Sequence, residues 1–499
     1  MSVNISKIGI IQSQALPGDF SRNLRRIVQG YRECLDRGAQ IAITSIYALS
    51  GLNPQDLMRR HSFTTQMEAA AEALAAELAV TDVPLITGFC INPLRTPVGD
   101  EFDDEWEADD GLLYDSEEED YGMHESVIMV PCVIHRGVIR LLTDGGTATI
   151  ADRLCHITTA GEESMPEGEV DLIVHLPKSP WNNRSTDKET QIYSWESHAA
   201  QAPVVCVHPV GTEGGDIYGG GSSLYVNNKL VDYLPFFEPA CRTLRTGLAR
   251  SAPTKNYPGL LLQVEKALTT GIHDTVRQQG YSGVCVPLDS PNGKLLTNLC
   301  IRALGADNVF AISFSGNKYP GIECIQLQVE ELLRPAREKL NPEYAPGLEQ
   351  RIKGCMLASS AEEKGMLLLS ALDRPTLMLG DFTLYGETCG YLAPLGSLYK
   401  VDLFLLCRHI AETEPDMAHA IEPPAQPEQD RIIHDLTERN IAASDILRHA
   451  QDGMEENPVR SIQRKIMASA LKRTQLPLIL NLAGKEEQLS IPLSSRLND

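Results

Sequence analysis

The first half of the chain alternates short apolar runs with amphipathic stretches, a pattern that predicts strands separated by helices. Helical spacing of apolar residues predicts helices over 21–38, beginning at Ser21 and ending at Gly38, and over 64–80. The segments 126–131 and 132–142 predict a hairpin-like pair of strands. Other apolar runs predict strands at 7–12, 39–46, 83–91, 170–177, 202–211 and 221–235.

The second half shows the same alternation. Apolar spacing predicts helices over 260–279, over 295–305 with its end at Gly305, and over 351–365. Apolar runs predict strands at 283–288, 308–315 and 376–381, and the last third reads as helices and loops. Strands separated by helices in both halves predict two α/β domains.

Length supports this division, because 499 residues exceed what one hydrophobic core normally organises. The segment 241–258 carries mixed charge and prolines and is expected to be a linker. It would separate a domain over 1–240 from a domain over 259–499.

The formal net charge of −23 argues against nucleic acids or anionic membranes as partners, because their phosphates would be repelled. Thirteen of the acidic residues lie in the segment 100–121, which contains no basic residue. This segment is either a solvated loop or a site for cations or a basic partner. No apolar run is long enough to span a bilayer, and no signal peptide opens the chain. The 12 cysteines form no CxxC pair, so reduced thiols and a cytoplasmic location are expected, without a metal site.

The order of these segments resembles the glutamine-dependent NAD(+) synthetase family over nearly the whole chain. The resemblance rests on the opening strand with its PGD turn (17–19), on LGADNVFAIS (304–313), on FTLYGETCGYLAPLGSLYK (382–400) and on KRTQ (472–475). It implies a nitrilase-like αββα sandwich followed by a Rossmann-like adenine-nucleotide α-hydrolase domain. In that family, ammonia from glutamine amidates an adenylated nicotinate dinucleotide, which implies ATP, Mg²⁺ and NAD or deamido-NAD as ligands.

The residues expected for the glutaminase half-reaction are altered. A nitrilase-type amidase needs a Cys nucleophile, a Glu that moves the proton and a Lys that stabilises the oxyanion. The resemblance places Ile46 at the Glu position, and Ile139 or Arg140 at the Lys position. Cys155 aligns with the nucleophile. Without a base or a cation it is either a buried structural thiol or a residual, weak nucleophile.

The loop expected to bind ATP phosphates reads DSPNGK (289–294), where the family has SGGxDS. Asp289 places a carboxylate where phosphates would lie, and Pro291 removes an amide donor. The Asp that helps to hold Mg²⁺ becomes Gly293, and the last Ser becomes Lys294, which could still bind an anion. The pair Gly293–Lys294 also suggests a Walker-type loop that lacks its first glycine. The candidate nucleotide-loop residues are Asp289, Ser290, Asn292, Gly293 and Lys294.

The dinucleotide-binding stretch is better preserved. The family's later Glu motif is deleted, and Asp381 is the nearby acid. Glycines in this stretch could equally serve turn geometry alone. The candidate dinucleotide-binding residues are Thr383, Tyr385, Gly386, Glu387, Lys400, Lys472 and Arg473.

These losses at three separate sites favour a pseudoenzyme that binds a dinucleotide or acts as a scaffolding or regulatory subunit. One alternative is a divergent, working NAD(+) synthetase in which Lys294 and Asp381 handle phosphate and Mg²⁺. Another is a new reaction that uses Cys155, His198 or His208. The resemblance also implies a homo-oligomer, or a hetero-oligomer with an active relative.

Overall fold

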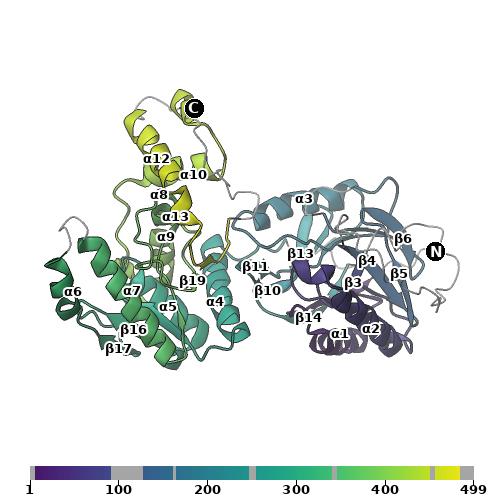
Figure 1. The fold of residues 1–499 in the computed structure, drawn as a ribbon. Helices are drawn as coiled ribbons and strands as arrows, with labels where there is room; N and C mark the ends of the chain where they lie inside the picture. Colours follow the sequence, from purple (N-terminus) through teal and green to yellow (C-terminus); the bar gives the residue numbers. More distant parts are fainter. Residues whose placement is uncertain are drawn as a thin grey trace, which may run out of the picture. The chain divides into compact units, whose positions relative to one another are not determined.

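The computed structural model describes residues 6–91, 127–160, 165–246, 254–339, 345–449 and 456–483. The acidic segment 100–121 lies outside these residues. The chain divides into two compact units (Figure 1). The first consists of 1–179, 185–211 and 218–257, and the second of 180–184, 212–217 and 258–499. The part of the chain that the structure describes contains no helix long and apolar enough to cross a membrane.

The first unit is built on two six-stranded sheets, with strand orders β14-β1-β2-β3-β4-β5 and β13-β12-β9-β8-β7-β6. Its elements are β1 (Lys7–Gln12), α1 (Phe20–Asp36), β2 (Ile41–Thr44), η1 (Gln55–Arg59), α2 (His61–Leu78), β3 (Leu85–Ile91), β4 (Ile128–His135), β5 (Val138–Leu141), β6 (Gly146–Ile150), β7 (Arg153–Thr158), β8 (Leu172–His175), α3 (Ser185–Ala199), β9 (Val204–Cys206), β12 (Ser223–Val226), β13 (Lys229–Tyr233) and β14 (Ala240–Arg245). The hairpin β10 (Val210–Glu213) and β11 (Asp216–Gly219) has its tip in the second unit.

Helices cover the outer faces of these sheets. The helices α1 and α2 pack on the sheet that contains β1 and β3, and α3 packs on the sheet that contains β9 and β12 (Figure 1). The inner faces share one hydrophobic core, to which Ile10 and Ile43 of one sheet and Ile157 and Val174 of the other contribute. The predicted αββα sandwich is therefore confirmed.

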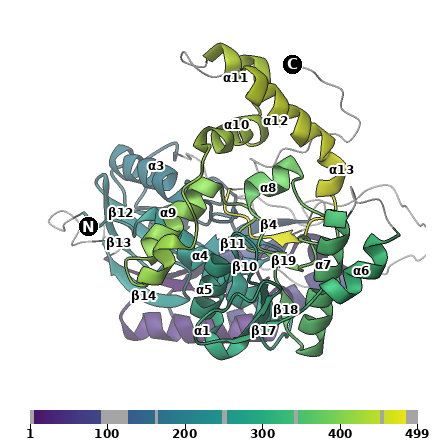
Figure 2. The ribbon, with the colours of Figure 1, turned by 90° about the vertical axis from the view of Figure 1, so that its left-hand side faces the viewer.

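The second unit contains a four-stranded parallel sheet of order β17-β16-β15-β18, surrounded by helices. Its elements are α4 (Leu260–Gln278), β15 (Val284–Pro287), α5 (Gly293–Leu304), η2 (Ala306–Asn308), β16 (Val309–Ser313), β17 (Glu323–Gln326), α6 (Glu330–Arg337), α7 (Ala345–Glu363), β18 (Leu367–Leu368), α8 (Arg374–Leu379), β19 (Leu392–Ala393), α9 (Lys400–Ile410), η4 (Pro415–His419), α10 (Pro427–Thr437), α11 (Ala443–His449), α12 (Glu456–Ala468), α13 (Ala470–Arg473) and β20 (Leu478–Ile479). Figure 2 shows α10, α11 and α12 grouped together, and they share a small core with α8.

Two predicted elements were wrong. The run 376–381 was predicted as a strand, but Arg374–Leu379 forms the helix α8. Its start and end follow local rules: the Asp373 side chain accepts a hydrogen bond from the Thr376 amide, a proline occupies the first turn, and Gly380 ends the helix in the left-handed conformation. The predicted break at 131/132 was also misplaced, because β4 runs through it and the hairpin turns at Arg136–Gly137.

The predicted linker over 241–258 contains a strand. Residues 240–245 form β14, which pairs antiparallel with β1 at the edge of the first sheet. The first unit extends to Tyr257, whose hydroxyl lies 2.7 Å from that of Tyr225. Its core is therefore completed by residues on the C-terminal side of the predicted boundary at 240.

Candidate functional site

The loop 289–294 connects β15 to α5, as the sequence predicted, and lies at the carboxyl end of the parallel sheet of the second unit. In open α/β sheets this edge is where ligands usually bind. Asn292 precedes the first turn of α5, and its buried side chain donates to the Ala371 carbonyl (2.9 Å) and to Asp373 (3.1 Å). The Ser290 hydroxyl donates to the Pro287 carbonyl (3.2 Å). Both side chains therefore hold the loop to its own domain.

Asp289 accepts hydrogen bonds from the segment that follows the neighbouring strand β16. The hydroxyls of Ser313 and Ser315 donate to its carboxylate at 2.9 and 2.6 Å, and the Asn317 amide donates at 2.9 Å. The Ser315 backbone amide donates at 3.0 Å, and the Phe314 amide donates to the same oxygen. Asp289 therefore takes up a set of donors of the kind that a phosphate would need.

Partial burial alone would raise the pKa of the Asp289 carboxyl. The hydrogen bonds from Ser315, Phe314 and Ser313 outweigh this effect and hold the pKa below its ordinary value. Asp289 is consequently an anion at neutral pH. A phosphate oxygen at the same donors would have to displace this carboxylate or lie against a like charge.

Gly293 begins α5 in a place with no room for a side chain. A Cβ atom there would lie 2.5 Å from the Leu288 carbonyl oxygen and 2.7 Å from that of Pro287. These are backbone atoms, so the close approach of α5 to the end of β15 requires glycine. Lys294 follows and is exposed, so its ammonium is the positively charged group of the loop and faces solvent.

The structure brings part of the predicted dinucleotide-binding set together. The Glu387 carboxylate accepts a hydrogen bond from the Thr383 amide (2.7 Å). Tyr385, 66% exposed, has a positive φ of 63° and donates its hydroxyl to Gln475 (2.9 Å), beside the turn that follows α13. Gly386 packs close to Gln350 of α7. This loop is thus fixed to the C-terminal segment through Tyr385.

Lys472 and Arg473 of α13 bind backbone carbonyls. The Lys472 ammonium donates to the carbonyls of Gly380 (2.9 Å) and Phe382 (3.0 Å). Arg473 donates to Met378 (3.1 Å) and to the Ile466 carbonyl (2.7 Å). Lys472 therefore anchors the start of the 382–400 stretch, and Arg473 joins α13 to α8 and α12. Lys400 is exposed at the first turn of α9, and no contact recorded in the structure joins it to this group.

Cys155 lies inside a strand and away from its carboxyl end. It is the third residue of β7, pairs with Leu172 of β8, and is completely buried in the core between the sheets. Burial raises the pKa of its thiol to about 12, with Asp171 acting in the same direction. The thiol is therefore protonated at pH 7. The geometry favours a structural thiol.

Ile46, and Ile139 of the pair Ile139 and Arg140, are apolar and packed at the positions expected to support the nucleophile. Ile46 follows β2, is 0% exposed and belongs to the same core as Cys155. Its carbonyl oxygen would lie 1.9 Å from a Cβ atom on Gly88 of β3, so the two backbones touch. Ile139 on β5 pairs with Ile134 and packs against this core, while Arg140 donates to the Thr149 carbonyl (2.8 Å).

Comparison with known proteins identifies the arrangement. A family model described as NAD synthase matches residues 264–476. A glutamine-dependent NAD(+) synthetase of Synechocystis sp. is 23% identical over 534 residues, with 94% of each chain covered. That of Thermotoga maritima is 20% identical, with 99% of each chain covered. Residues 264–476 therefore match the NAD synthase family, and the chain as a whole is similar to glutamine-dependent NAD(+) synthetases.

Solved structures of this family have the same fold. A glutamine-dependent NAD(+) synthetase from Cytophaga hutchinsonii superposes with a TM-score of 0.78 at 12% identity, with 98% of each chain covered. That from Acinetobacter baumannii, in complex with ADP, has a TM-score of 0.68 at 16% identity, with 94% of each chain covered. These superpositions confirm the fold expected from the sequence, a nitrilase-like domain followed by a synthetase domain.

The ATP and Mg²⁺ implied by the family do not fit the residues of the 289–294 loop. Asp289 accepts hydrogen bonds from the donors beside the loop, and its carboxylate adds a negative charge there. The position of the family's metal-binding carboxylate is Gly293, where a side chain would overlap the backbone. Asp381, the other candidate acid, lies 3.2 Å from the Lys465 ammonium. Across the described ranges, His, Cys, Asp and Glu form no group of three that could hold a metal ion.

Sequence reasoning missed a polar group at the carboxyl end of β7 and β8. Asp144 accepts hydrogen bonds from the backbone amide (2.7 Å) and the hydroxyl of Thr159, and the Lys178 ammonium lies 3.5 Å away. The available signal was the position of Lys178, just after the predicted strand 170–177. The double contact with Thr159 is typical of a carboxylate that caps a turn.

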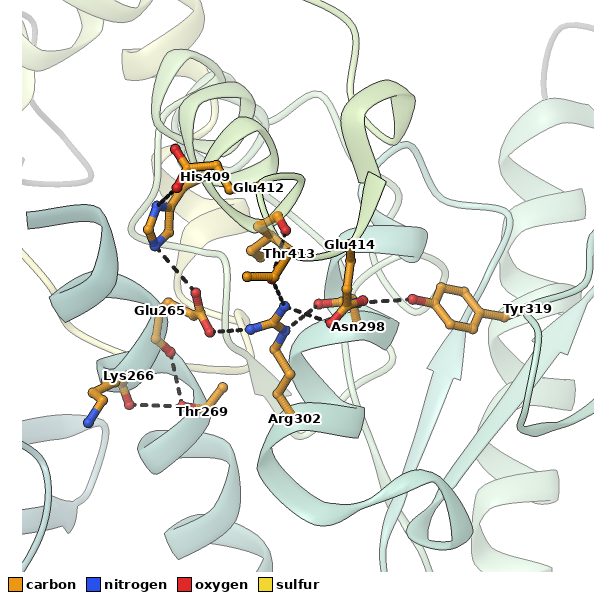
Figure 3. Close-up of polar contacts among 11 residues, drawn as sticks. Glu265, Lys266, Thr269, Asn298, Arg302, Tyr319, His409, Glu412, Thr413 and Glu414 are labelled. Carbon is orange, nitrogen blue, oxygen red and sulfur yellow. Dashed lines mark hydrogen bonds and ion pairs between the residues drawn. The ribbon is translucent and has the colours of Figure 1, made fainter. Parts of the chain in front are cut away.

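A second missed cluster holds the C-terminal half of α5 (Figure 3). Arg302 donates to Glu265 of α4 (2.7 Å), to Glu414 (2.6 Å) and to Thr413 (3.1 Å). Asn298 of the same helix donates to Tyr319 (3.1 Å) and to Glu414. Because α5 begins at the 289–294 loop, these contacts fix the direction from which the helix meets the loop.

Replacing Arg302 by methionine should lower the free energy of unfolding of the second unit by roughly 1–2 kcal/mol, because Glu265 and Glu414 would lose their shared cation. Denaturant titration followed by circular dichroism would measure it. The matched control is Arg448→Met, which removes a surface pair with Asp445 (2.8 Å) and should change stability by less than about 0.5 kcal/mol. Equal losses in both variants would contradict the assigned role of Arg302.

Replacing Asp289 by asparagine should destabilise the loop 313–317 at neutral pH by about 1 kcal/mol, because a charged acceptor of five donors becomes neutral. The folded pKa of Asp289 is depressed, so its contribution is complete above the unfolded value of about 3.8 and is lost as the pH falls through the lower folded pKa. The difference between wild type and variant should therefore be present in full at pH 7 and be smaller at pH 3. Unfolding at both pH values measures it, with Asp307→Asn as an exposed control, and a difference independent of pH would contradict the prediction.

Proposed function

We propose that this chain is a non-catalytic member of the glutamine-dependent NAD(+) synthetase family that binds a dinucleotide and acts as a scaffolding or regulatory subunit. The observation that carries this proposal is the Asp289 carboxylate, which accepts the hydrogen bonds of Ser313, Ser315, Asn317 and the Phe314 amide. An ATP-cleaving loop needs such donors for the phosphates. In this chain the Asp289 carboxylate accepts these hydrogen bonds instead.

The remaining chemical positions support the same conclusion. Ile46 is fully buried where an amidase of this family would need a proton carrier, and Cys155 is a buried, neutral thiol inside a strand. Gly293 leaves no space for a metal-binding side chain. The residues around Ile46, Cys155 and Gly293 are packed closely against them. A single substitution would therefore not restore either half-reaction.

A dinucleotide is the ligand that the remaining candidate residues favour. Tyr385 offers an exposed aromatic ring for stacking, and Lys294 and Lys400 offer exposed ammonium groups for phosphates. The partner we propose is a second copy of this chain or an active member of the family. A regulatory subunit of this kind would act in the cytoplasm, without nucleic acid or membrane.

Calorimetric titration of the full chain tests the binding half of this proposal. NAD⁺ and deamido-NAD should bind, inorganic pyrophosphate should not, and Tyr385→Ala should weaken dinucleotide binding about tenfold. Trp195→Ala, which removes an exposed ring from α3 of the first unit, is the control and should leave binding unchanged. Tight binding of pyrophosphate would favour the alternative of a divergent working synthetase. Absence of dinucleotide binding would contradict the proposed ligand.

A further inference from the structure

Two free thiols lie against each other in the first unit. The sulfur atoms of Cys34 on α1 and Cys241 on β14 are 3.4 Å apart, although 207 positions separate them in sequence. Cys34 is completely buried, and Cys241 is partly exposed at the edge strand of the sheet. The two thiols are therefore in contact with each other, and one of them, Cys241, is accessible to solvent.

The surroundings hold both cysteines in place. The Cys241 sulfur lies 3.2 Å from the Gly30 carbonyl oxygen, and the Arg37 guanidinium donates to the Cys241 carbonyl (2.8 Å). The hydrogen bond with Cys34 lowers the pKa of Cys241, and the same contact, together with burial, raises the pKa of Cys34. Cys241 is therefore the more readily ionised thiol and the one that solvent reaches.

We propose that Cys34 and Cys241 form a reversible oxidation site, at which a peroxide converts the thiol pair into an intramolecular disulfide. This inference is independent of the proposed function, because it concerns the first unit and requires neither ligand binding nor catalysis. It assigns a role to two cysteines that neither the dinucleotide stretch nor the 289–294 loop involves.

With hydrogen peroxide, the Cys241 thiolate attacks one oxygen, so an S–O bond forms, the O–O bond breaks and one water leaves after proton uptake. The Cys34 sulfur then attacks the Cys241 sulfur, so the S–S bond forms, the S–O bond breaks and a second water leaves. Two electrons pass from the two thiols to the peroxide, and the thiol protons end in the two waters. A dithiol reductant reverses the reaction.

The disulfide would fasten α1 to the edge strand β14. This strand pairs with β1 over Lys7–Gln12, and the chain leaves the first sheet after it. A bond that closes so long a loop restricts the unfolded chain strongly. Oxidation should therefore raise the midpoint of thermal unfolding of the first unit by roughly 5 °C or more.

Mass spectrometry of the full chain tests the proposal. Trypsin should release Cys34 in the peptide 33–37 and Cys241 in the peptide 230–242, each with a single cysteine. After mild peroxide treatment of the folded protein, these two peptides should appear joined without reductant and separate with dithiothreitol. When the protein is unfolded in denaturant for labelling, iodoacetamide should modify both thiols of the untreated protein and neither thiol of the oxidised protein.

Two variants and a control make the result specific. Cys241→Ser should abolish the joined peptides and the rise in unfolding temperature, and Cys34→Ser should leave Cys241 oxidised to sulfenic or sulfinic acid. Cys324→Ser removes a partly exposed thiol that lies against the Asn317 carbonyl (3.5 Å) and should change neither readout. The proposal would be overturned if the joined peptides failed to form at a peroxide concentration that oxidises Cys324. It would also be overturned if they formed equally well in denaturant.

Discussion

Glutamate in place of Ile46 should unfold the first unit and yield no glutaminase activity. Ile46 is 0% exposed in the core that the two sheets share, and its carbonyl touches the backbone at Gly88. A carboxylate there would be desolvated without a cation or donor, which costs about 4 kcal/mol or more. Denaturant titration measures this loss, and ammonia release from glutamine measures activity.

Ile46→Val is the matched control, because it keeps an apolar side chain and should cost only about 1 kcal/mol. The contrast between valine and glutamate separates the effect of charge from that of lost volume. A stable Ile46→Glu protein would mean that the site admits water. A stable variant that also hydrolysed glutamine would show that the glutaminase site is one substitution from function.

Aspartate in place of Gly293 should destabilise the second unit by about 3 kcal/mol, because its Cβ atom would overlap the carbonyl oxygens of Leu288 and Pro287. The family's metal-binding carboxylate therefore cannot be restored without moving the start of α5. Thermal and denaturant unfolding measure the loss, and ATP turnover should remain undetectable.

The control for this variant is Gly347→Asp in the first turn of α7. A Cβ atom at Gly347 would meet only the tip of the Arg351 side chain, which can move aside. This change should alter stability by less than about 0.5 kcal/mol. If Gly293→Asp were equally tolerated, the loop would be adaptable, and the argument that its backbone excludes a metal ligand would fail.

Periodicity was enough to predict most of the elements, since helices such as α1 and α5 carry regular apolar faces and bounded ends. The error at 376–381 arose because an apolar run of six residues suits a strand or a buried helix equally well. Asp373, Pro375 and Gly380 together mark a short helix, and this local signal was outweighed by the apolar run.

The sequence predicted a carboxylate in the phosphate loop, but its partners could not be predicted. Asp289 binds residues 24 to 28 positions later, which meet it only because β15 and β16 are neighbours in the sheet. The thiol contact between Cys34 and Cys241 depends in the same way on β14 pairing with β1. Such contacts are set by tertiary structure, and no spacing along the chain encodes them.

Formation of NAD⁺ by the purified full chain tests the central claim most directly. The protein would be incubated with deamido-NAD, ATP, Mg²⁺ and either glutamine or ammonium, beside an active member of the family as a positive control. Loss of both half-reactions predicts no NAD⁺ above the level of the protein-free mixture with either nitrogen source. Turnover that scales with protein concentration, with glutamine or with ammonium, would contradict it.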